Sequence, residues 1–433
     1  MYKISTMAEK IAILRRYNFW DKEMPDVGFP RHFYLNKIKA FTGNRLIKVL
    51  VGQRRVGKSY LLRQIIKSLI TGGVSPENIL YVNMEFVDFD FISNYKDLKA
   101  LIDLYKSELK PEGKIYIFID EIQNIERWEY LINSYSQDYT QDIEIFITGS
   151  NSKLLSGELA TLLSGRYIRF EVYPFSYKEF VEFRKLRKNK ENYIRYLQSS
   201  GLPELYNLPD EEAKRHYVLS LIDTILLRDI IQRYRVKNPV LLLDIFTFLV
   251  NNASNLISIN KIVNYFNSKN RKTNYETVSN YIEYLKDAFL IYRANRYNIK
   301  GKEILSGSSK FYINDLAYKN YLYSGFGYGI GYMLENLIFL DLKRHEFDVF
   351  TGYMRNKEID FVALKNDRVI YIQVSYLLQN EETKEREYSP LQKIQDNYEK
   401  YVVTLDDIQF PGKNGIKHIR AWEFEKYLNE KIC

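Results

Sequence analysis

The sequence predicts an α/β fold whose core is a parallel sheet of five strands, followed by two smaller modules. Three observations lead to this prediction. Short apolar runs alternate with helical segments, the first run leads into a glycine-containing loop and a helix, and the third run ends in two adjacent carboxylates. Such alternation is typical of parallel sheets, because each crossover between parallel strands needs a covering helix. The runs lie at residues 45–51, 78–84, 115–119, 143–148 and 168–173.

The loop after the first predicted strand reads GQRRVGKS, which matches the pattern G-x-x-x-x-G-K-[ST]. Its glycines allow a tight turn that points N–H groups inward, and the following helix offers its positive end to the phosphates of a nucleotide. Lys58 would reach the β and γ phosphates, and the Ser59 hydroxyl would coordinate a bridging Mg²⁺. A chance glycine turn is the alternative, and the flanking strand and helix disfavour it. The expected nucleotide-binding residues of the loop are Gly52, Gln53, Arg54, Arg55, Val56, Gly57, Lys58, Ser59 and Tyr60.

The third predicted strand ends in Asp120 and Glu121, at the edge where a doubly wound sheet binds ligands. Asp120 would hold the Mg²⁺ ion, and Glu121 would orient or deprotonate the attacking water. In the alternative interpretation, the pair simply caps a helix that begins at Ile122. The upstream loop favours hydrolysis over capping.

The fourth predicted strand ends in a polar cluster that includes Ser150. We expect Ser150 to touch the γ phosphate or to position the water. The alternative is an ordinary turn between strand and helix with a serine cap.

Four segments, taken in order, resemble the prokaryotic AAA-type ATPases that carry a C-terminal nuclease-like domain of uncharacterised function. The segments are GQRRVGKS, IYIFIDEIQNIERWE, FITGSNSKLLS and LSGRYIRFEVYPFSYKEF. The resemblance extends over nearly the whole chain and implies that the nucleotide is ATP, hydrolysed to ADP and phosphate. These proteins are similar to the archaeal-type ATPases of the P-loop class, so the resemblance also implies a winged-helix module after the ATPase core. It further implies that residues 201–203 correspond to the G-x-P segment of a helical lid.

We therefore expect three domains. Residues 1–210 would form a P-loop NTPase core with its helical lid, residues 211–318 a winged-helix module, and residues 319–433 an α/β domain similar to restriction endonucleases.

The predicted winged-helix module consists of three helices and a β-hairpin. Helices are expected at residues 241–250 and 258–266, and a third is expected to start at Thr273, whose hydroxyl would form a capping box with Glu276. The hairpin strands at residues 289–297 and 310–313 would be joined by a polar turn containing Gly301 and Gly307. The exposed face of the third helix is mainly acidic, which repels phosphate. A packing module that transmits motion is therefore slightly favoured over a DNA-reading helix.

The C-terminal region resembles PD-(D/E)xK nucleases but departs from their pattern. Glu335 and Asp360 lie where the metal ligands of that class are expected, but the E-x-K position reads Gln373-Val-Ser375. A neutral amide adds no charge for a metal, and a serine cannot replace an ammonium. We predict a nuclease fold without nuclease activity. Glu335, Glu358 and Asp360 would either bind a metal weakly or pair with Arg355 and Lys357.

An arginine from a neighbouring subunit often completes the site of such ATPases by neutralising transition-state charge. Arg166 is the first candidate and Arg228 the second, although each is equally compatible with an internal ion pair. The predicted catalytic set is therefore Lys58, Glu121 and Arg166. The sequence leaves oligomerisation open.

The composition indicates a globular protein with a basic surface. The 433 residues carry a formal net charge of +9, which favours contact with polyanions. Double-stranded DNA is thus a candidate partner beside a protein. The densest basic run, at residues 184–190, is predicted on a helix, as a solvated face or a phosphate-binding stripe.

The predicted compartment follows from the low cysteine content and from the lack of a long apolar segment. A single cysteine, Cys433, excludes an internal disulfide framework and points to a reducing compartment. No apolar stretch approaches the about 18 residues of a spanning helix, and residues 1–5 lack a signal-peptide core. We expect a cytoplasmic protein with no membrane partner.

Two functions are compatible with these predictions. In the favoured one, hydrolysis of ATP with Mg²⁺ drives a conformational change that controls binding of a macromolecular partner, either DNA or a protein. In the alternative, the protein is an ATP-regulated, metal-dependent nuclease.

Overall fold

The computed structural model describes residues 6–152, 163, 165–322, 329–354 and 357–432. Two compact units divide the chain, Met1–Val172 and Tyr173–Cys433. Residues 173–210, which we assigned to the ATPase core as its lid, group with the second unit. The division into three domains stays a prediction.

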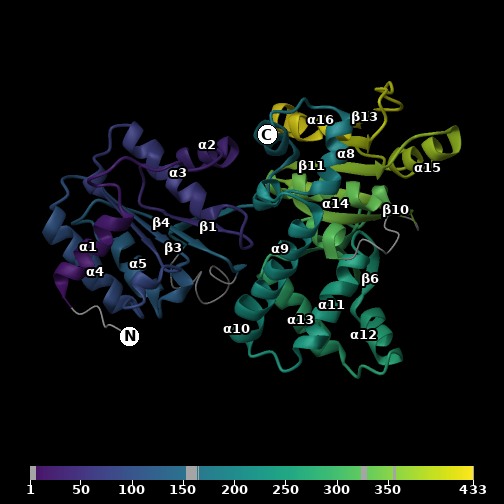
Figure 1. Cartoon of the computed structure of the whole chain (residues 1–433). Helices are drawn as coiled ribbons and strands as arrows, with labels where there is room; N and C mark the ends of the chain where they lie inside the picture. The colour runs from purple at the N-terminus through teal and green to yellow at the C-terminus, as the bar shows by residue number, and fades with distance from the viewer. Residues whose placement is uncertain (1–5, 153–162, 164, 323–328, 355–356, 433) are drawn as a thin grey trace. The chain divides into compact units, whose positions relative to one another are not determined.

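The first unit contains the predicted parallel sheet. Its strand order is β2-β3-β4-β1-β5, and every neighbouring pair is parallel, which confirms the prediction of a five-stranded parallel sheet. Figure 1 shows α2 and α3 on one face of this sheet and α1, α4 and α5 on the other. The strands are β1 (Ile47–Val51), β2 (Ile79–Asn83), β3 (Ile115–Asp120), β4 (Ile143–Gly149) and β5 (Tyr167–Glu171). The helices are α1 (Met7–Tyr17), α2 (His32–Lys39), α3 (Lys58–Thr71), α4 (Tyr95–Leu109) and α5 (Trp128–Gln137).

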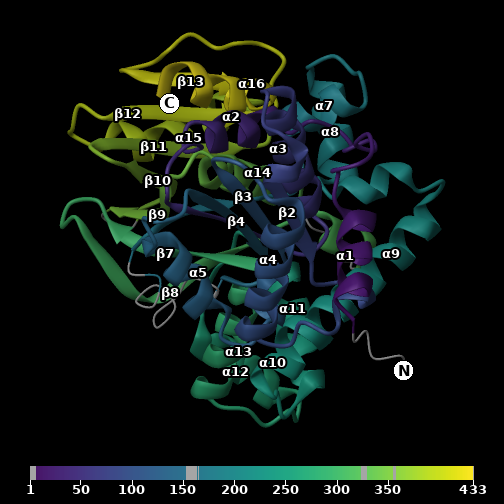
Figure 2. The ribbon, with the colours of Figure 1, turned by 90° about the vertical axis from the view of Figure 1, so that its left-hand side faces the viewer.

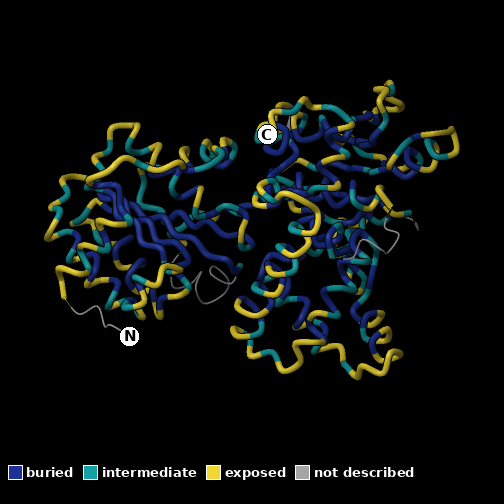
Figure 3. Tube along the Cα trace, viewed as in Figure 1, coloured by how far each residue is buried: buried dark blue, intermediate teal, exposed yellow. Residues whose placement is uncertain are grey.

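The apolar runs form strands because helices cover both faces of the sheet. Every residue of β1, β2, β3 and β4 is buried, whereas the edge strand β5 is only partly covered. Figure 3 shows these strands as a buried layer beneath exposed loops. Phe118 and Phe146 stack their rings 4.6 Å apart within the core. In a parallel sheet all the carboxyl ends lie at one edge, so the loops after β1, β3 and β4 lie close together.

The second unit begins with helices and continues into a mixed sheet. The helices are α7 (Tyr177–Phe183), α8 (Lys190–Ser199), α9 (Glu211–Thr224), α10 (Gln232–Tyr234), α11 (Pro239–Asn251), α12 (Ile259–Ser268), α13 (Tyr275–Asp287), α14 (Ile330–Arg344), α15 (Glu381–Gln392) and α16 (Ala421–Tyr427). The strands are β6 (Leu256–Ser258), β7 (Ile291–Asn298), β8 (Glu303–Ile313), β9 (Asp348–Met354), β10 (Lys357–Lys365), β11 (Arg368–Ser375), β12 (Glu399–Thr404) and β13 (Ile416–Arg420).

These strands form one continuous eight-stranded sheet. Its order is β13-β12-β11-β10-β9-β7-β8-β6, and Figure 2 shows β13 to β8 stacked in this sequence. The predicted hairpin β7–β8 is antiparallel, and its strand β7 pairs in parallel with β9 from the predicted C-terminal domain. The strand pairing therefore crosses the boundary that we placed between residues 318 and 319.

Residues 173–210 are held to the rest of the second unit by buried hydrogen bonds. The Gly201 N–H donates to Asp315 Oδ2 over 2.9 Å, and the Ser176 hydroxyl donates to Glu425 Oε1 over the same distance. Tyr173, Tyr193 and Leu205 also belong to the hydrophobic core of this unit. These contacts explain why the predicted lid groups with the C-terminal part of the chain.

Three local predictions were wrong. The cap of α13 is Asn274, whose side chain accepts from the Thr277 N–H, so Thr273 forms no capping box. Gly307 lies inside β8, where the register with β7 shifts, and the hairpin turn ends earlier, before Glu303. The basic run at residues 184–190 follows the end of α7 and leads into α8, so most of it lies in a loop.

Among the described residues, no helix is both long enough and apolar enough to span a bilayer.

Candidate active site

The phosphate-loop sequence connects β1 to α3 at the carboxyl edge of the sheet. Gly52 has φ of +150°, and a Cβ there would lie 2.3 Å from the Val172 carbonyl oxygen, so a side chain has no room. Gly57 has φ of +95° and precedes the first turn of α3, where glycine is the residue that adopts this conformation without strain. The two glycines thus allow the loop to pass close to β5 and to enter the helix.

Lys58 is buried and folds back over its own loop. Its Nζ donates to the carbonyl oxygens of Gly52 and Gln53 over 2.9 and 3.0 Å, and it lies 3.6 Å from Glu121 Oε1. The ammonium is therefore centred inside the loop, where a phosphate would compete for it.

Asp120 is fully buried at the end of β3 and is held by hydroxyl groups. Tyr81 donates its hydroxyl to Asp120 Oδ2 over 3.2 Å, and the Thr148 hydroxyl donates to Oδ1. Burial and the charge of Glu121 raise the pKa of Asp120, whereas hydrogen bonds from Ser59 and Thr148 oppose this rise. Ser59 and Asp120 thus meet, and they offer two hard oxygen atoms of the kind that Mg²⁺ prefers.

Glu121 follows Asp120 in a left-handed backbone conformation, with φ of 55°. Burial alone would raise the pKa of its carboxyl, but the charges of Lys58 and Arg54 hold that pKa below its ordinary value. Hydrogen bonds from Gln123 and Ser150 act in the same direction. A short helix does begin at Ile122 with Glu121 at its N-cap position, as the alternative interpretation expected, but the Glu121 side chain makes no cap hydrogen bond there.

Thr148 joins the two carboxylate positions. Besides donating to Asp120, its Oγ1 accepts the backbone N–H of Glu121 over 2.9 Å. Thr148 is completely buried, and the sequence marks it only as the end of a strand. The third and fourth strands are therefore tied together directly beneath the phosphate loop.

Replacing Thr148 by valine is expected to lower the free energy of unfolding of the first unit by about 1–3 kcal/mol, the cost of leaving a buried polar group without a partner. The Glu121 N–H would lose its acceptor and Asp120 would lose a donor. Equilibrium urea unfolding of the full chain measures this change. Thr71→Val, at the exposed end of α3, is the matched control. Equal stability of the two variants would contradict the role of Thr148.

The other predicted loop residues differ in what they contact. Gln53 and Val56 are fully buried, Arg54 pairs with Glu85 at the end of β2, and Arg55 is exposed with φ of 67°. Tyr60 is half-exposed, and the Arg63 guanidinium lies 4.4 Å from its ring centroid.

Arg31, a buried arginine that the sequence did not mark as a site residue, contacts the loop through its guanidinium. Arg31 donates its Nη1 to the Val56 carbonyl over 2.9 Å, and its own N–H donates to Gln64 Oε1 over 3.1 Å. No motif or spacing marks Arg31 in the sequence, because its partners are distant along the chain. This contact fixes the middle of the phosphate loop against α3.

Of the two candidate arginines, Arg166 does not lie at this site within its own chain. Arg166 precedes β5, and β5 pairs with β1 so that Tyr167 lies beside Ile47 and Glu171 beside Val51. The length of β1 therefore separates the backbone of Arg166 from the phosphate loop. Arg228 is exposed in the second unit, within the helical stretch Ile225–Ile231. An arginine supplied by a neighbouring subunit stays a prediction.

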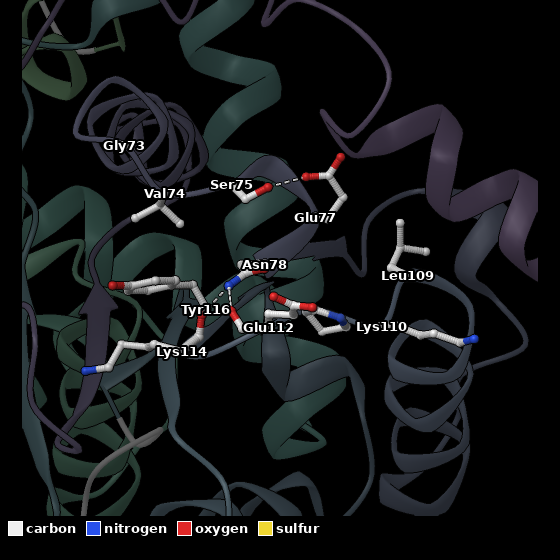
Figure 4. Close-up of a pocket in the computed structure, with 11 residues that line it drawn as sticks. Gly73, Val74, Ser75, Glu77, Asn78, Leu109, Lys110, Glu112, Lys114 and Tyr116 are labelled. Atoms are coloured by element: carbon white, nitrogen blue, oxygen red, sulfur yellow. Dashed lines mark hydrogen bonds between the residues drawn. The ribbon is translucent and has the colours of Figure 1, made fainter.

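A polar pocket of about 520 Å³ lies at the opposite edge of the first sheet (Figure 4). Residues 73–78, which precede β2, and residues 109–114, which precede β3, supply most of its lining. Asn78 spans it by donating to the carbonyl oxygens of Glu112 and Lys114. This pocket lies at the amino ends of the strands and is separate from the phosphate loop.

The predicted metal ligands of the C-terminal region lie together around a different cation. The side chains of Glu335, Glu358 and Asp360 all pair with Lys310 of β8. Lys357, one of the two partners that we predicted, instead donates to the Ser389 hydroxyl over 2.7 Å, and Arg355 lies outside the described residues. No group of His, Cys, Asp and Glu among the described residues has the arrangement of a metal site.

Comparison with known proteins identifies two domain families. Residues 44–181 match the AAA domain, and residues 190–327 match a domain of unknown function (DUF8612). An uncharacterized protein of Haemophilus influenzae is 37% identical over 378 residues, which cover 86% of this chain and 92% of the relative. An uncharacterized protein of Methanocaldococcus jannaschii is 34% identical over 384 residues, which cover 84% and 83% of the two chains. The chain belongs to the family of these two proteins.

Two solved structures are also similar to part of this chain, at low sequence identity. The Walker-type ATPase of Pyrococcus abyssi is 18% identical to this chain, with a TM-score of 0.44 over 68% of this chain and 95% of that protein. The Aeropyrum pernix Orc1 protein, solved in complex with DNA, is 14% identical, with a TM-score of 0.30 over 70% and 94%. The AAA domain match supports ATP binding by the first unit.

Proposed function

We propose that this protein is a Mg²⁺-dependent ATPase that couples hydrolysis to a conformational change and to binding of a macromolecular partner. One observation carries the proposal. Lys58 and Ser59, which begin α3, meet Asp120, the last residue of β3, and Glu121, the next residue, at the carboxyl edge of the parallel sheet. This is the edge at which open α/β sheets bind their ligands.

Lys58 would bind the β and γ phosphates of ATP, and α3 would direct its first N–H groups at them. Its present hydrogen-bond acceptors are neutral carbonyl oxygens, and charged phosphate oxygens form stronger hydrogen bonds with an ammonium. Ser59 and Asp120 would hold Mg²⁺, which neutralises charge on the phosphates when it is bound. Gln53 to Gly57 and Tyr60 would surround the rest of the nucleotide.

Glu121 would orient the attacking water. Because its pKa is held below the ordinary value, the carboxylate is ionised near neutral pH and is a hydrogen-bond acceptor there. A weak base of this kind is better suited to orienting water than to removing its proton before attack. Ser150 and Gln123, which both contact Glu121, would fix the direction of that acceptor. Arg166 would act only from a neighbouring subunit.

The second unit would convert nucleotide turnover into partner binding. We assign a winged-helix module to α11, β6, α12, α13 and the β7–β8 hairpin, since these elements follow each other in the order that the module requires, and the three strands pair side by side. We assign a nuclease-like domain to α14 and β9 to β13. The winged-helix module and the nuclease-like domain would then be two modules whose strands belong to one eight-stranded sheet.

Electrostatics on α13 favours a protein partner over DNA for this module. Lys286 is paired with Glu283 over 2.6 Å, and Arg271, which precedes the helix, is paired with Asp244. Much of the positive charge that would attract phosphate is thus already neutralised. Among the described residues, nothing favours the nuclease alternative, because Gln373 and Ser375 hold the positions of the expected glutamate and lysine.

Phosphate release from ATP by the purified full chain, with Mg²⁺ or with EDTA and with or without double-stranded DNA, tests the proposal. We expect turnover that requires Mg²⁺. Stimulation by DNA would identify nucleic acid as the partner, and turnover indifferent to DNA would favour a protein. Failure to bind ATP in the presence of Mg²⁺ would overturn the proposal.

A further inference from the structure

Lys310 lies at the centre of an acidic cluster in the second unit. Its Nζ is 2.9 Å from Glu335 Oε1, 2.7 Å from Glu358 Oε1 and 3.2 Å from Asp360 Oδ1. The lysine comes from β8, one glutamate from α14, and the other two carboxylates from β10. Only 4% of the Lys310 side chain is exposed, so this ammonium is enclosed by its partners.

We propose that the ammonium of Lys310 is the resident cation of this acidic site and that it excludes a divalent metal ion from it. The inference is independent of the ATPase proposal. It assigns to Lys310 the position that a metal ion would need in order to be held by Glu335 and Asp360.

The hydrogen-bonding capacity of the cluster supports the proposal. An ammonium has three N–H donors, and Lys310 has three carboxylates within hydrogen-bonding or ion-pairing distance. Two of the carboxylates have further partners, since Glu335 Oε1 also accepts the Tyr312 hydroxyl over 2.8 Å and Asp360 Oδ2 accepts the Val374 N–H over 2.8 Å. A metal would have to displace several of these bonds.

Charge also favours a permanent ammonium. Three carboxylates lie within 3.2 Å of the Lys310 Nζ, and carboxylates this close favour the charged form of a lysine. A divalent cation placed among the same carboxylates would lie close to this charge and be repelled by it.

A pocket of about 530 Å³ beside the cluster shows that shape alone does not exclude an ion. Glu335, Asp360, Gln373 and Ser375 contribute to its lining. The Gln373 side-chain oxygen faces the Asp360 N–H at 3.4 Å, so this amide braces the strand that carries Asp360. The pocket is accessible, and the resident ammonium accounts for the exclusion of the metal.

Mn²⁺ binding to the nucleotide-free full chain, followed by electron paramagnetic resonance, tests the proposal. The wild type and Asp360→Asn are expected to bind Mn²⁺ equally, because the cluster holds none in either protein. Lys310→Met is expected to gain a single Mn²⁺ site, which the double variant Lys310→Met/Asp360→Asn loses again. Lys302→Met, in the exposed turn before β8, is the matched control and is expected to behave as wild type.

Two results would overturn the proposal. The first is a Mn²⁺ site in the wild type that Asp360→Asn abolishes, because the metal would then coexist with the ammonium. The second is a folded Lys310→Met protein, judged by circular dichroism, that gains no site. If Lys310→Met does not fold, a Mn²⁺ site in the wild type that Asp360→Asn abolishes would still overturn the proposal.

Discussion

Replacing Lys58 by alanine is expected to lower kcat for ATP hydrolysis by about a hundredfold or more, the effect typical of losing a charged group that stabilises a transition state. Lys58 is the cation enclosed by the loop carbonyls, and it lies 3.6 Å from Glu121. Arg54 cannot take its place readily, since it is paired with Glu85. Weaker ATP binding is expected as well, because the ammonium would contact the bound phosphates.

Steady-state phosphate release and titration with a fluorescent ATP analogue measure the two effects. Lys67→Ala removes an exposed lysine from the same helix α3 and is expected to leave both unchanged. Since Lys58 also lowers the pKa of Glu121, the Lys58→Ala protein should be checked for folding by circular dichroism. A folded Lys58→Ala protein with the activity of Lys67→Ala would rule out the proposed site.

Replacing Glu121 by glutamine is expected to separate binding from hydrolysis. Glutamine has nearly the same shape, but its neutral amide is a much poorer acceptor for the attacking water. We expect kcat to fall by about 10²–10⁴, as for loss of a general base or water-orienting group. ATP affinity should change little, and removal of the negative charge beside Lys58 should, if anything, tighten binding.

Single-turnover hydrolysis measures the chemical step, and a separate titration measures ATP affinity, so the two effects can be distinguished. Glu108→Gln, at an exposed position on α4, is the matched control for the same chemical change. Loss of binding and hydrolysis together in Glu121→Gln would mean that the residue is structural. Unchanged hydrolysis would remove Glu121 from the mechanism.

Local features of the first unit could be predicted because they depend on residues that are close in sequence. Strands β1 to β4 read as short, mainly apolar runs, since helices cover both faces of a parallel sheet. The turn into α3 is encoded by Gly52 and Gly57, and the lysine and serine that follow are placed by the helix itself. The exact cap residue of a helix was harder to predict, because two adjacent polar residues can both cap it. At α13 the cap is Asn274 and not Thr273.

Contacts between distant segments could not be predicted in this way. Thr148 meets Asp120 across 28 residues, and Lys310 meets Glu335 and Asp360 across 25 and 50 residues. These pairs depend on strand order and register, which place β4 beside β3 and bring β8 and β10 to the same cluster as α14. The residues next to Thr148 and Lys310 in the sequence do not indicate which distant side chains these two residues contact.

The sequence alone thus determined the parallel sheet, the phosphate loop and the two carboxylates, because turns, caps and apolar runs are specified by neighbouring residues. The tertiary structure decided that Thr148 joins Asp120 to Glu121, that Arg166 precedes the strand at the far end from the loop, and that a lysine fills the acidic cluster of the second unit. The physical reason is that strand pairing and burial of charge depend on chain segments that meet only after folding.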